Sequence, residues 1–316
     1  MLRVFRLNNQ RLEQIQSAEA EELYQDALWI DIVGTTDEDR ALIQRVYNVS
    51  LPDAEDLEEI EATARFFKDD EGSLHVHSFF LHDFEDTPAN VTVAFILKHG
   101  RLFTIHKEQL ATIRLFRLRA RGPSAQVGNA MAILLSLFTT KVDRLADTLE
   151  LVYTSLESAS EKVLRQSDKD LHELLGEVAE FEDVCGKARL SLLDTQRALT
   201  FILRNMKLEA EQVEQIRDVL RDVESLLPHT AFLFDKVNFL MDAIQGFINI
   251  EQNRIIKIFS IAAVVFLPPT LVASIYGMNF HIMPELSWSF GYPLAIVLMV
   301  LSGISPYWYF KRRGWL

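Results

Sequence analysis

The residues best suited to chemistry lie near the C-terminus, where oxygen-bearing side chains recur at helical spacing. Asp242, Asn253 and Thr270 belong to a series whose members follow one another at intervals of three and four residues, and Gly277-Met278-Asn279 comes at its end. Side chains at these intervals lie on one face of a helix. Carboxylate, amide and hydroxyl oxygens accept hydrogen bonds from the water shell of a cation. The neutral amide of Asn279, placed where an apolar run meets a short polar loop, therefore suggests a pore mouth that handles hydrated ions.

The complete series forms one slowly drifting stripe along a predicted helix. It alternates small or polar residues with isolated apolar ones: Asp242, Gly246, Asn249, Asn253, Ile256, Ser260, Ala263, Leu267, Thr270, Ser274 and Gly277. Small and hydroxyl residues also favour close packing between membrane helices. From spacing alone, the stripe is either a seam between helices or the lining of a pore.

Two apolar segments must position this stripe. Residues 258–275 form a run of 18 without a charge, and with their neighbours they reach the roughly 20 residues that cross about 30 Å of hydrocarbon. Residues 292–310 form a second run of 19, with tyrosine and tryptophan at its ends as expected at membrane interfaces. The sequence predicts transmembrane spans at 255–276 and 292–310, joined by a loop at 277–291.

Positive charges predict the orientation of these spans. Arg254 and Lys257 precede the first span and three basic residues in the tail 311–316 follow the second, whereas 277–291 has no Lys or Arg. The positive-inside rule then places both termini in the cytoplasm. The N-terminal sequence lacks the apolar core of a signal peptide, and the single cysteine, Cys185, fits a reducing compartment.

The net charge of −13 is concentrated before the first span. Residues 1–250 hold 43 acidic residues against 27 Lys and Arg. Such an excess disfavours nucleic acid, which binds basic faces, and is compatible with attraction for cations. Ordinary solubility charge accounts for most of these residues. The chain also has no Gly-x-x-x-x-Gly-Lys-Ser/Thr sequence to hold a nucleotide. We therefore expect no nucleic-acid partner, no nucleotide and only passive transport.

Residues 1–125 predict a cytoplasmic α/β domain. Apolar runs at 27–32, 75–81, 91–97 and 101–105 are typical of strands and are separated by turn signals. His75 and His77 alternate along one of these runs, which is compatible with a metal site. Without a nearby cysteine or third histidine, a surface or core role is the stronger interpretation.

The rest of the sequence before the spans predicts long helices. Residues 126–210 predict an antiparallel helical hairpin, because apolar residues recur at helical spacing: Leu134, Leu137, Phe138, Val142, Leu145, Leu149 and Val152. Residues 211–254 predict a stalk helix that continues into the first span, a rod of roughly 100 Å at 1.5 Å per residue. Two spans per chain cannot enclose a polar path, so oligomerisation is implied.

Several motifs resemble those of the CorA family of bacterial magnesium transporters, within the 2-TM-GxN superfamily. Gly277-Met278-Asn279 is followed by Met283-Pro284-Glu285-Leu286, by Gly291-Tyr292-Pro293 and by the terminal YFKRRGWL. The order of an α/β domain, a helical hairpin, a stalk helix and two terminal spans is similar over the whole chain. The likeness is to the enterobacterial type of the family.

This resemblance implies an α+β multi-domain membrane protein that forms a funnel-shaped homopentamer in the bacterial inner membrane. The family's selectivity filter corresponds to Gly277, Met278 and Asn279. The other pore positions correspond to members of the stripe: Thr270, Leu267, Ile256, Asn253 and Asp242. The implied function is uptake of hydrated Mg²⁺, and also of Co²⁺ and Ni²⁺, driven by the membrane potential.

Neutral oxygens suit magnesium because this ion sheds its octahedral water shell reluctantly. A ring of Asn279 amides can hydrogen-bond to the bound waters, and it avoids the deep trap that a carboxylate ring would make. In the outer loop, Glu285 either concentrates cations by its charge or is an ordinary surface residue.

The resemblance also implies regulation by cytoplasmic Mg²⁺ at sites between neighbouring subunits. The stalk aspartate of such a site matches Asp218, and its candidate partner in the α/β domain is Asp83, for which an ordinary solvated acid is the alternative. Bound ions would neutralise facing carboxylates and favour a closed state.

Two other functions compete with this one. A zinc-transporting branch shares the fold, but Gly-Met-Asn with Met-Pro-Glu-Leu favours the magnesium branch. A non-conducting membrane-anchored scaffold has no need for Asn253 and Thr270 near or inside the bilayer. None of these functions requires catalysis, so no enzyme activity is expected.

Overall fold

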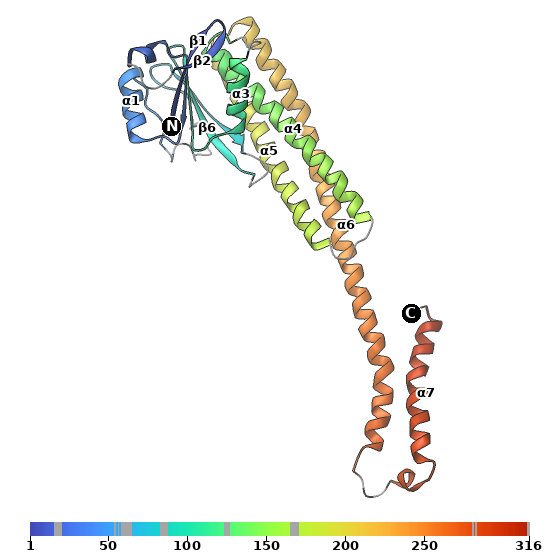
Figure 1. Ribbon diagram of the computed structural model, residues 1–316. Coiled ribbons are helices and arrows are strands. Elements are labelled where there is room, and N and C mark those ends of the chain that lie inside the picture. The colour runs from blue at the N-terminus through green and yellow to red at the C-terminus, as the bar shows by residue number, and fades with distance from the viewer. Residues whose placement is uncertain are drawn as a thin grey trace. The chain divides into compact units, whose positions relative to one another are not determined.

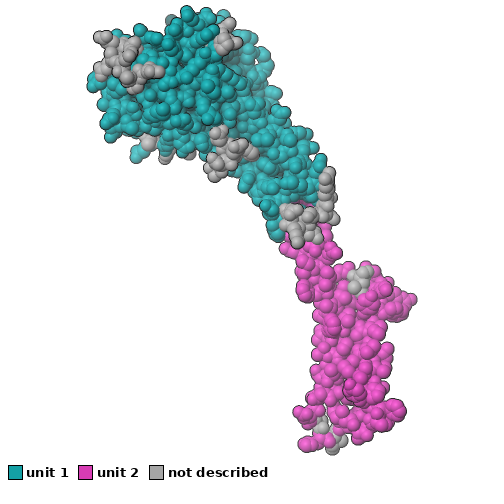
Figure 2. Space-filling model, viewed as in Figure 1, with its two compact units in different colours: residues 1–241 teal, residues 242–316 magenta. Residues whose placement is uncertain are grey.

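The computed structural model describes residues 1–15, 21–53, 55, 57, 65–82, 88–122, 127–164, 171–279, 281 and 283–314. These residues divide into two compact units, 1–241 and 242–316, which are described in turn (Figure 2). Asp83 lies outside the described residues, so its expected role at a regulatory Mg²⁺ site stays a prediction.

The N-terminal unit is built on a mixed β-sheet (Figure 1). Its described strands are β1 (Leu2–Asn8), β2 (Arg11–Ile15), β3 (Trp29–Val33), β4 (Phe66–Lys68), β5 (Leu74–Leu81), β6 (Asn90–Lys98) and β7 (Arg101–His106). Their order is β2-β1-β3-β7-β6-β5-β4, in which β3 and β7 are parallel and the other neighbours are antiparallel. The four predicted apolar runs are β3, β5, β6 and β7.

The apolar pattern did not predict β1, β2 and β4, which lie towards the edges of the sheet. Leu12 is the one fully buried residue in β2, and β4 has none. An edge strand that is half solvated gives a weak apolar signal, because few of its side chains enter the core. β2 pairs with β1 and β4 pairs with β5, in each case across a short connection.

Helices cover both faces of the sheet (Figure 1). On one face lies α1 (Asp37–Tyr47), whose Ile43 packs in a core with Ile30 and Ile96. A capping box between Thr36 and Asp39 fixes the start of this helix. On the other face lie α3 (Ala111–Arg121), α4 (Ala130–Leu164) and α5 (Leu171–Asn205).

The first helix of the predicted hairpin, α4, buries the face that its sequence pattern indicates. Each of the seven apolar residues predicted for this face is 3% exposed or less. Phe138 reaches the sheet, where its ring centroid lies 5.6 Å from that of Phe95. The predicted pair of long helices is therefore confirmed as α4 and α5.

The last two helices carry the apolar segments. Helix α6 (Ala210–Tyr276) has 67 residues and is uninterrupted at Pro228, Pro268 and Pro269, so the predicted continuation of the stalk into the first apolar segment is confirmed. Helix α7 (Gly291–Arg312) follows a 3-10 turn, η2 (Pro284–Ser287). Both helices are long and apolar enough to cross a membrane, with mean hydropathies of 2.2 and 1.5 over 18 residues.

Candidate functional site

The contact between α6 and α7 defines which side of α6 is free. Within 258–276, the partly buried residues of α6 recur at helical spacing: Ile261, Ala262, Val265, Pro268, Pro269, Val272 and Tyr276. The corresponding residues of α7 are Gly291, Ala295, Met299, Ser302, Gly303, Pro306 and Phe310. A Cβ atom at Gly303 would lie 3.2 Å from Cγ of Pro269, so the helices approach closely at this glycine.

The stripe lies on the opposite side of α6. Each residue turns an α-helix by about 100°, so a residue two positions away lies on nearly the opposite face. Leu267 comes two positions after Val265 and therefore lies on nearly the opposite face; it is 65% exposed. Ile256 is 61% exposed. The stripe residues Asn253, Ser260, Ala263, Thr270 and Ser274 are also exposed. The stripe is therefore not the seam between α6 and α7.

Thr270 presents hydrogen-bond acceptors on this exposed side. Its Oγ1 donates to the carbonyl oxygen of Phe266 at 2.8 Å. The hydroxyl proton is thereby used within the helix, and the oxygen lone pairs stay available. Water molecules around a cation turn their protons outward, so Thr270 offers them acceptors.

Gly277-Met278-Asn279 follows the end of α6 directly. The backbone nitrogen of Gly277 donates to the carbonyl of Ala273 at 2.9 Å, and that of Met278 donates to Ile275 at 3.3 Å. Asn279 comes after this closing turn and is exposed.

The backbone at Gly277 does not adopt a left-handed conformation, because Gly277 is not among the described glycines with positive φ. Instead, a Cβ atom here would lie 3.2 Å from the carbonyl oxygen of Ala273. Glycine therefore permits the close approach of the last turn rather than a left-handed conformation.

At the other end of the stripe, Asp242 and Asn253 are exposed on α6. Arg254 lies 3.6 Å from Glu251 across one turn, so one of the two positive charges before the apolar segment is paired locally. The exposed side-chain oxygens of Asp242 and Asn253 can face water or a hydrated ion.

Asp218 lies on the N-terminal part of α6 and is paired within its own helix. Its Oδ1 lies 3.1 Å from Nη1 of Arg221, and both side chains are largely exposed. Among the described residues, no three His, Cys, Asp or Glu side chains are grouped closely enough to hold a metal ion. The described part of one chain therefore does not by itself form the expected regulatory site.

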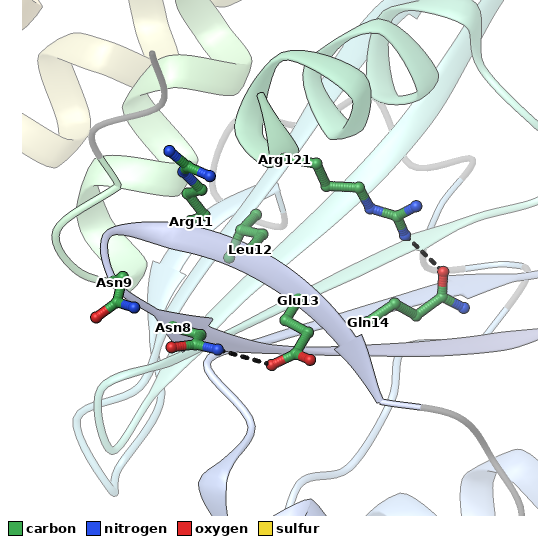
Figure 3. Close-up of a pocket in the computed structure, with 7 residues that line it drawn as sticks. All are labelled: Asn8, Asn9, Arg11, Leu12, Glu13, Gln14 and Arg121. Carbon is green, nitrogen blue, oxygen red and sulfur yellow. Dashed lines mark hydrogen bonds between the residues drawn. The ribbon is translucent and has the colours of Figure 1, made fainter. Parts of the chain in front are cut away.

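The hollow over the β1–β2 hairpin offers no chemical alternative. This open depression of about 600 Å³ is lined by Asn8, Asn9, Arg11, Leu12, Glu13, Gln14 and Arg121 (Figure 3). Its charged and amide groups bond to one another: Glu13 accepts from Arg6 and Asn8, and Gln14 accepts from Arg121. The bond between Arg121 and Gln14 joins the hairpin to α3, and the other two bonds lie within the hairpin.

A buried ionic cluster in the sheet is likewise structural. Asp31 accepts a hydrogen bond from Thr104 at 2.8 Å and lies 2.9 Å from Nε2 of His106, while Arg3 and Arg117 lie within 3.6 Å. Burial alone would raise the pKa of Asp31, but the bonds and charges of His106, Thr104 and Arg117 lower it below its ordinary value. The cluster ties β3 and β7 to β1 and α3.

Gly291 was named from the sequence only as part of a family motif and Gly303 was not named, and no packing role was predicted for either glycine. A Cβ atom at Gly291 would lie 2.1 Å from the carbonyl oxygen of Glu285, a distance that no side chain can occupy. A glycine inside an apolar span is a known sign of close helix packing, and this signal could have indicated Gly303. Gly291 could not be found in this way, because its neighbour belongs to the loop.

The fold is that of a multi-domain membrane protein with one large N-terminal unit and two C-terminal helices that are long and apolar enough to span a bilayer. A family model described as "CorA-like Mg2+ transporter protein" matches residues 24–312. The chain is 54% identical over its whole length to the whole magnesium transport protein CorA of Escherichia coli K12, and 53% identical to that of Salmonella typhimurium. The complete structure of the CorA magnesium transporter from Methanocaldococcus jannaschii superposes with a TM-score of 0.73 at 21% identity, covering 100% of this chain and 99% of that one.

The chain belongs to the CorA family of magnesium transporters. The resemblance found in its motifs is therefore confirmed, as is the fold class of an α/β domain, long helices and two terminal apolar helices. Its close relatives are named as transport proteins.

Proposed function

We propose that five copies of this chain form a channel for passive uptake of hydrated Mg²⁺, with the five α6 helices around the pore. The observation that carries the proposal is the position of the stripe: it is exposed and opposite α7. A polar stripe facing hydrocarbon would be costly. It needs either water or another copy of α6, and a ring of copies supplies both.

In this channel, Asn279 forms the outer ring with Gly277 and Met278. Its amide oxygens accept hydrogen bonds from the water shell, which Mg²⁺ keeps because it dehydrates reluctantly. Thr270 forms a second ring of acceptors, because its own proton is bonded to Phe266. Selection then acts on the size and geometry of the hydrated ion, and Co²⁺ and Ni²⁺, with similar hydration shells, are further substrates.

Leu267 and Ile256 form apolar constrictions that lose water when the helices close together. Asn253 and Asp242 line the inner end, where acceptors and a carboxylate rehydrate and release the ion. Glu285 lies in the outer loop and raises the local cation concentration there through its charge.

The membrane potential drives the ion inward. Two charges at about 2.3 kcal/mol each per 100 mV give roughly 4.6 kcal/mol per ion. This is sufficient without a nucleotide. The proposal places the protein in the bacterial inner membrane, with both termini and the acidic N-terminal unit in the cytoplasm.

Cytoplasmic Mg²⁺ closes the channel by binding between subunits at Asp218, with Asp83 of the neighbouring copy as its candidate partner. In one chain Asp218 is held by Arg221 at 3.1 Å, so a bound ion must displace or share this arginine. Loss of the ion leaves facing carboxylates that repel one another and loosen the symmetric closed arrangement.

The test is Mg²⁺ entry into proteoliposomes that contain the purified full-length protein, under an imposed inside-negative potential. Asn279→Ala is compared with the parent, and Asn205→Ala, at an exposed position of α5 outside the stripe, serves as a matched amide-to-alanine control. We expect entry in the parent, a loss of at least about tenfold in Asn279→Ala, and little change in Asn205→Ala.

Three outcomes decide between functions. Equal entry in the parent and Asn279→Ala contradicts the filter assignment. No entry of any divalent cation at low internal Mg²⁺ supports the scaffold. Entry of Zn²⁺ without Mg²⁺ supports the zinc branch, although the curated relatives are named for magnesium.

A further inference from the structure

The segment between the two apolar helices exposes an unusual set of bulky apolar side chains. At every second position stands a large apolar residue: Leu286 is 59% exposed, Trp288 55%, Phe290 64% and Tyr292 79%. Ser287, Ser289 and Gly291 stand between them. We refer to Leu286, Trp288, Phe290 and Tyr292 as the loop patch. A set this apolar rarely faces water without a partner.

The segment that carries the loop patch is a folded turn. Leu286 donates to Met283 at 3.1 Å and Gly291 donates to Trp288 at 2.9 Å through their backbone nitrogens. Ser287 Oγ donates to the carbonyl of Pro284 at 2.8 Å.

Gly291 fixes this turn to the start of α7. A Cβ atom at this position would lie 2.1 Å from the carbonyl oxygen of Glu285, so only glycine allows the turn to lie this close. In Figure 1, η2 lies against the end of α7 where that helix begins. The turn therefore presents the loop patch in one arrangement.

The surroundings of the loop patch favour lipid as its partner. The patch is followed along the chain by exposed apolar residues of α7, which include Leu294, Val297, Val300 and Leu301. Gly291 is the first residue of α7, so Phe290 and Tyr292 flank the point where an apolar span begins. Tryptophan and tyrosine are enriched at membrane–water interfaces. Glu285 is the one Asp, Glu, Lys or Arg in 277–291, so few charges oppose entry into the headgroup region.

We propose that the loop patch lies in the headgroup region of the bilayer and anchors the outer loop to the lipid surface, with Gly291 fixing the shape of the anchor. The loop then moves with α7 and the lipid instead of freely in water. The inference rests on the membrane insertion of α7, and not on which ion is carried.

The test uses a fluorescent label at Ser289, between Trp288 and Phe290. In a full-length Cys185→Ala background, Ser289→Cys, Ser158→Cys and Leu298→Cys are labelled with an environment-sensitive dye and reconstituted in phosphatidylethanolamine and phosphatidylglycerol vesicles. Ser158 lies exposed on α4 and serves as the aqueous control, and Leu298 lies exposed on α7 and serves as the hydrocarbon control. Quenching is measured with headgroup nitroxide lipid, mid-chain nitroxide lipid, and iodide on both sides.

We expect headgroup nitroxide to quench the Ser289 label at least about twofold more than the Ser158 label, and iodide to show the reverse order. Adding Trp288→Ser and Phe290→Ser, or Gly291→Ala alone, should increase quenching of the Ser289 label by iodide.

Two results overturn the proposal. In one, the Ser289 label behaves like the Ser158 label and the segment lies in water. In the other, both quenchers are excluded from Ser289, and a neighbouring copy covers the patch. If mid-chain nitroxide does not quench the Leu298 label, α7 is not inserted in the membrane, and both this premise and the anchor proposal are contradicted. Failure of ion entry, in contrast, leaves the anchor intact.

Discussion

Lys141 of α4 and Asp194 of α5 meet in the interior of the N-terminal unit, with 3.9 Å between Nζ and Oδ2. Ser78 of β5 connects them: it accepts from Lys141 at 3.0 Å and donates to Asp194 at 2.6 Å. Arg65 lies 2.9 Å from the other oxygen of Asp194. Two cations therefore share one buried carboxylate, and this cluster joins both helices of the hairpin to the sheet.

The first prediction concerns the charge of Lys141. Its pKa is lowered to about 7, chiefly by burial; the charge of Asp194 opposes the shift and that of Arg65 adds to it. Between pH 10.5, the ordinary pKa of lysine, and about pH 7, the unfolded chain binds one proton more at Lys141 than the folded chain does. Stability from this group therefore decreases as pH falls through this window and is constant below it.

Lys141→Met should remove this dependence. The difference in unfolding free energy between Lys141→Met and the parent should increase by up to about 1.4 kcal/mol per pH unit as pH falls from 10 to 7. The measurement is the unfolding midpoint of the full-length protein in detergent across this range. Lys162→Met, at an exposed ion pair with Glu177, is the control and should follow the parent. Parallel curves for Lys141→Met and the parent would contradict a shifted lysine.

A second prediction concerns the acceptor role of Thr270. Thr270→Val keeps the shape of the side chain but removes the oxygen, whereas Thr270→Ser keeps the oxygen. If water shells of the ion bond to this oxygen, Thr270→Val should reduce Mg²⁺ entry by several-fold and Thr270→Ser should reduce it much less. Proteoliposome flux at saturating Mg²⁺ measures both. Equal flux through the two variants would show that Thr270 acts by packing alone.

A third prediction tests the close contact between the spans. Gly303→Val adds a side chain whose Cβ atom would lie 3.2 Å from Cγ of Pro269 and 3.6 Å from the carbonyl oxygen of Val265. Overpacking of this kind costs about 1–3 kcal/mol. The thermal midpoint of the purified protein should fall, while Val300→Ile, at an exposed position of the same helix, should leave it nearly unchanged. An unchanged midpoint for Gly303→Val would mean that the helices separate easily at this point.

A fourth prediction concerns gating and rests on the proposed function. Arg221→Gln removes the local partner of Asp218, so less internal Mg²⁺ should be needed to halve the flux, by several-fold. Asp218→Lys places a fixed positive charge where the ion binds and should keep flux low without internal Mg²⁺. The measurement is entry as a function of preloaded internal Mg²⁺. Unchanged midpoints in both variants would remove Asp218 from regulation.

Much of the fold and of the candidate site could be predicted from local periodicity in the sequence. The apolar series of α4, the two spans, the four central strands and the polar stripe each depend on residues a few positions apart, which one helix or strand brings together. The family motifs also lie in short continuous segments. These features are visible without a partner segment, because the backbone geometry of a single element already sets which side chains share a face.

The tertiary structure determined which face of each helix or strand packs against which neighbouring element. The burial pattern of α6 and α7 and the packing of Pro269 on Gly303 show that the stripe lies opposite α7, and the fold of the loop brings Glu285 onto Gly291. The buried groups around Asp31 and Asp194 join residues that are 75 and 116 positions apart in sequence. No spacing rule predicts such pairs, because their distance is set by chain reversal and the mutual packing of separate elements. The sequence determined the elements and their chemistry, and the packing determined which side of α6 is left free for an ion.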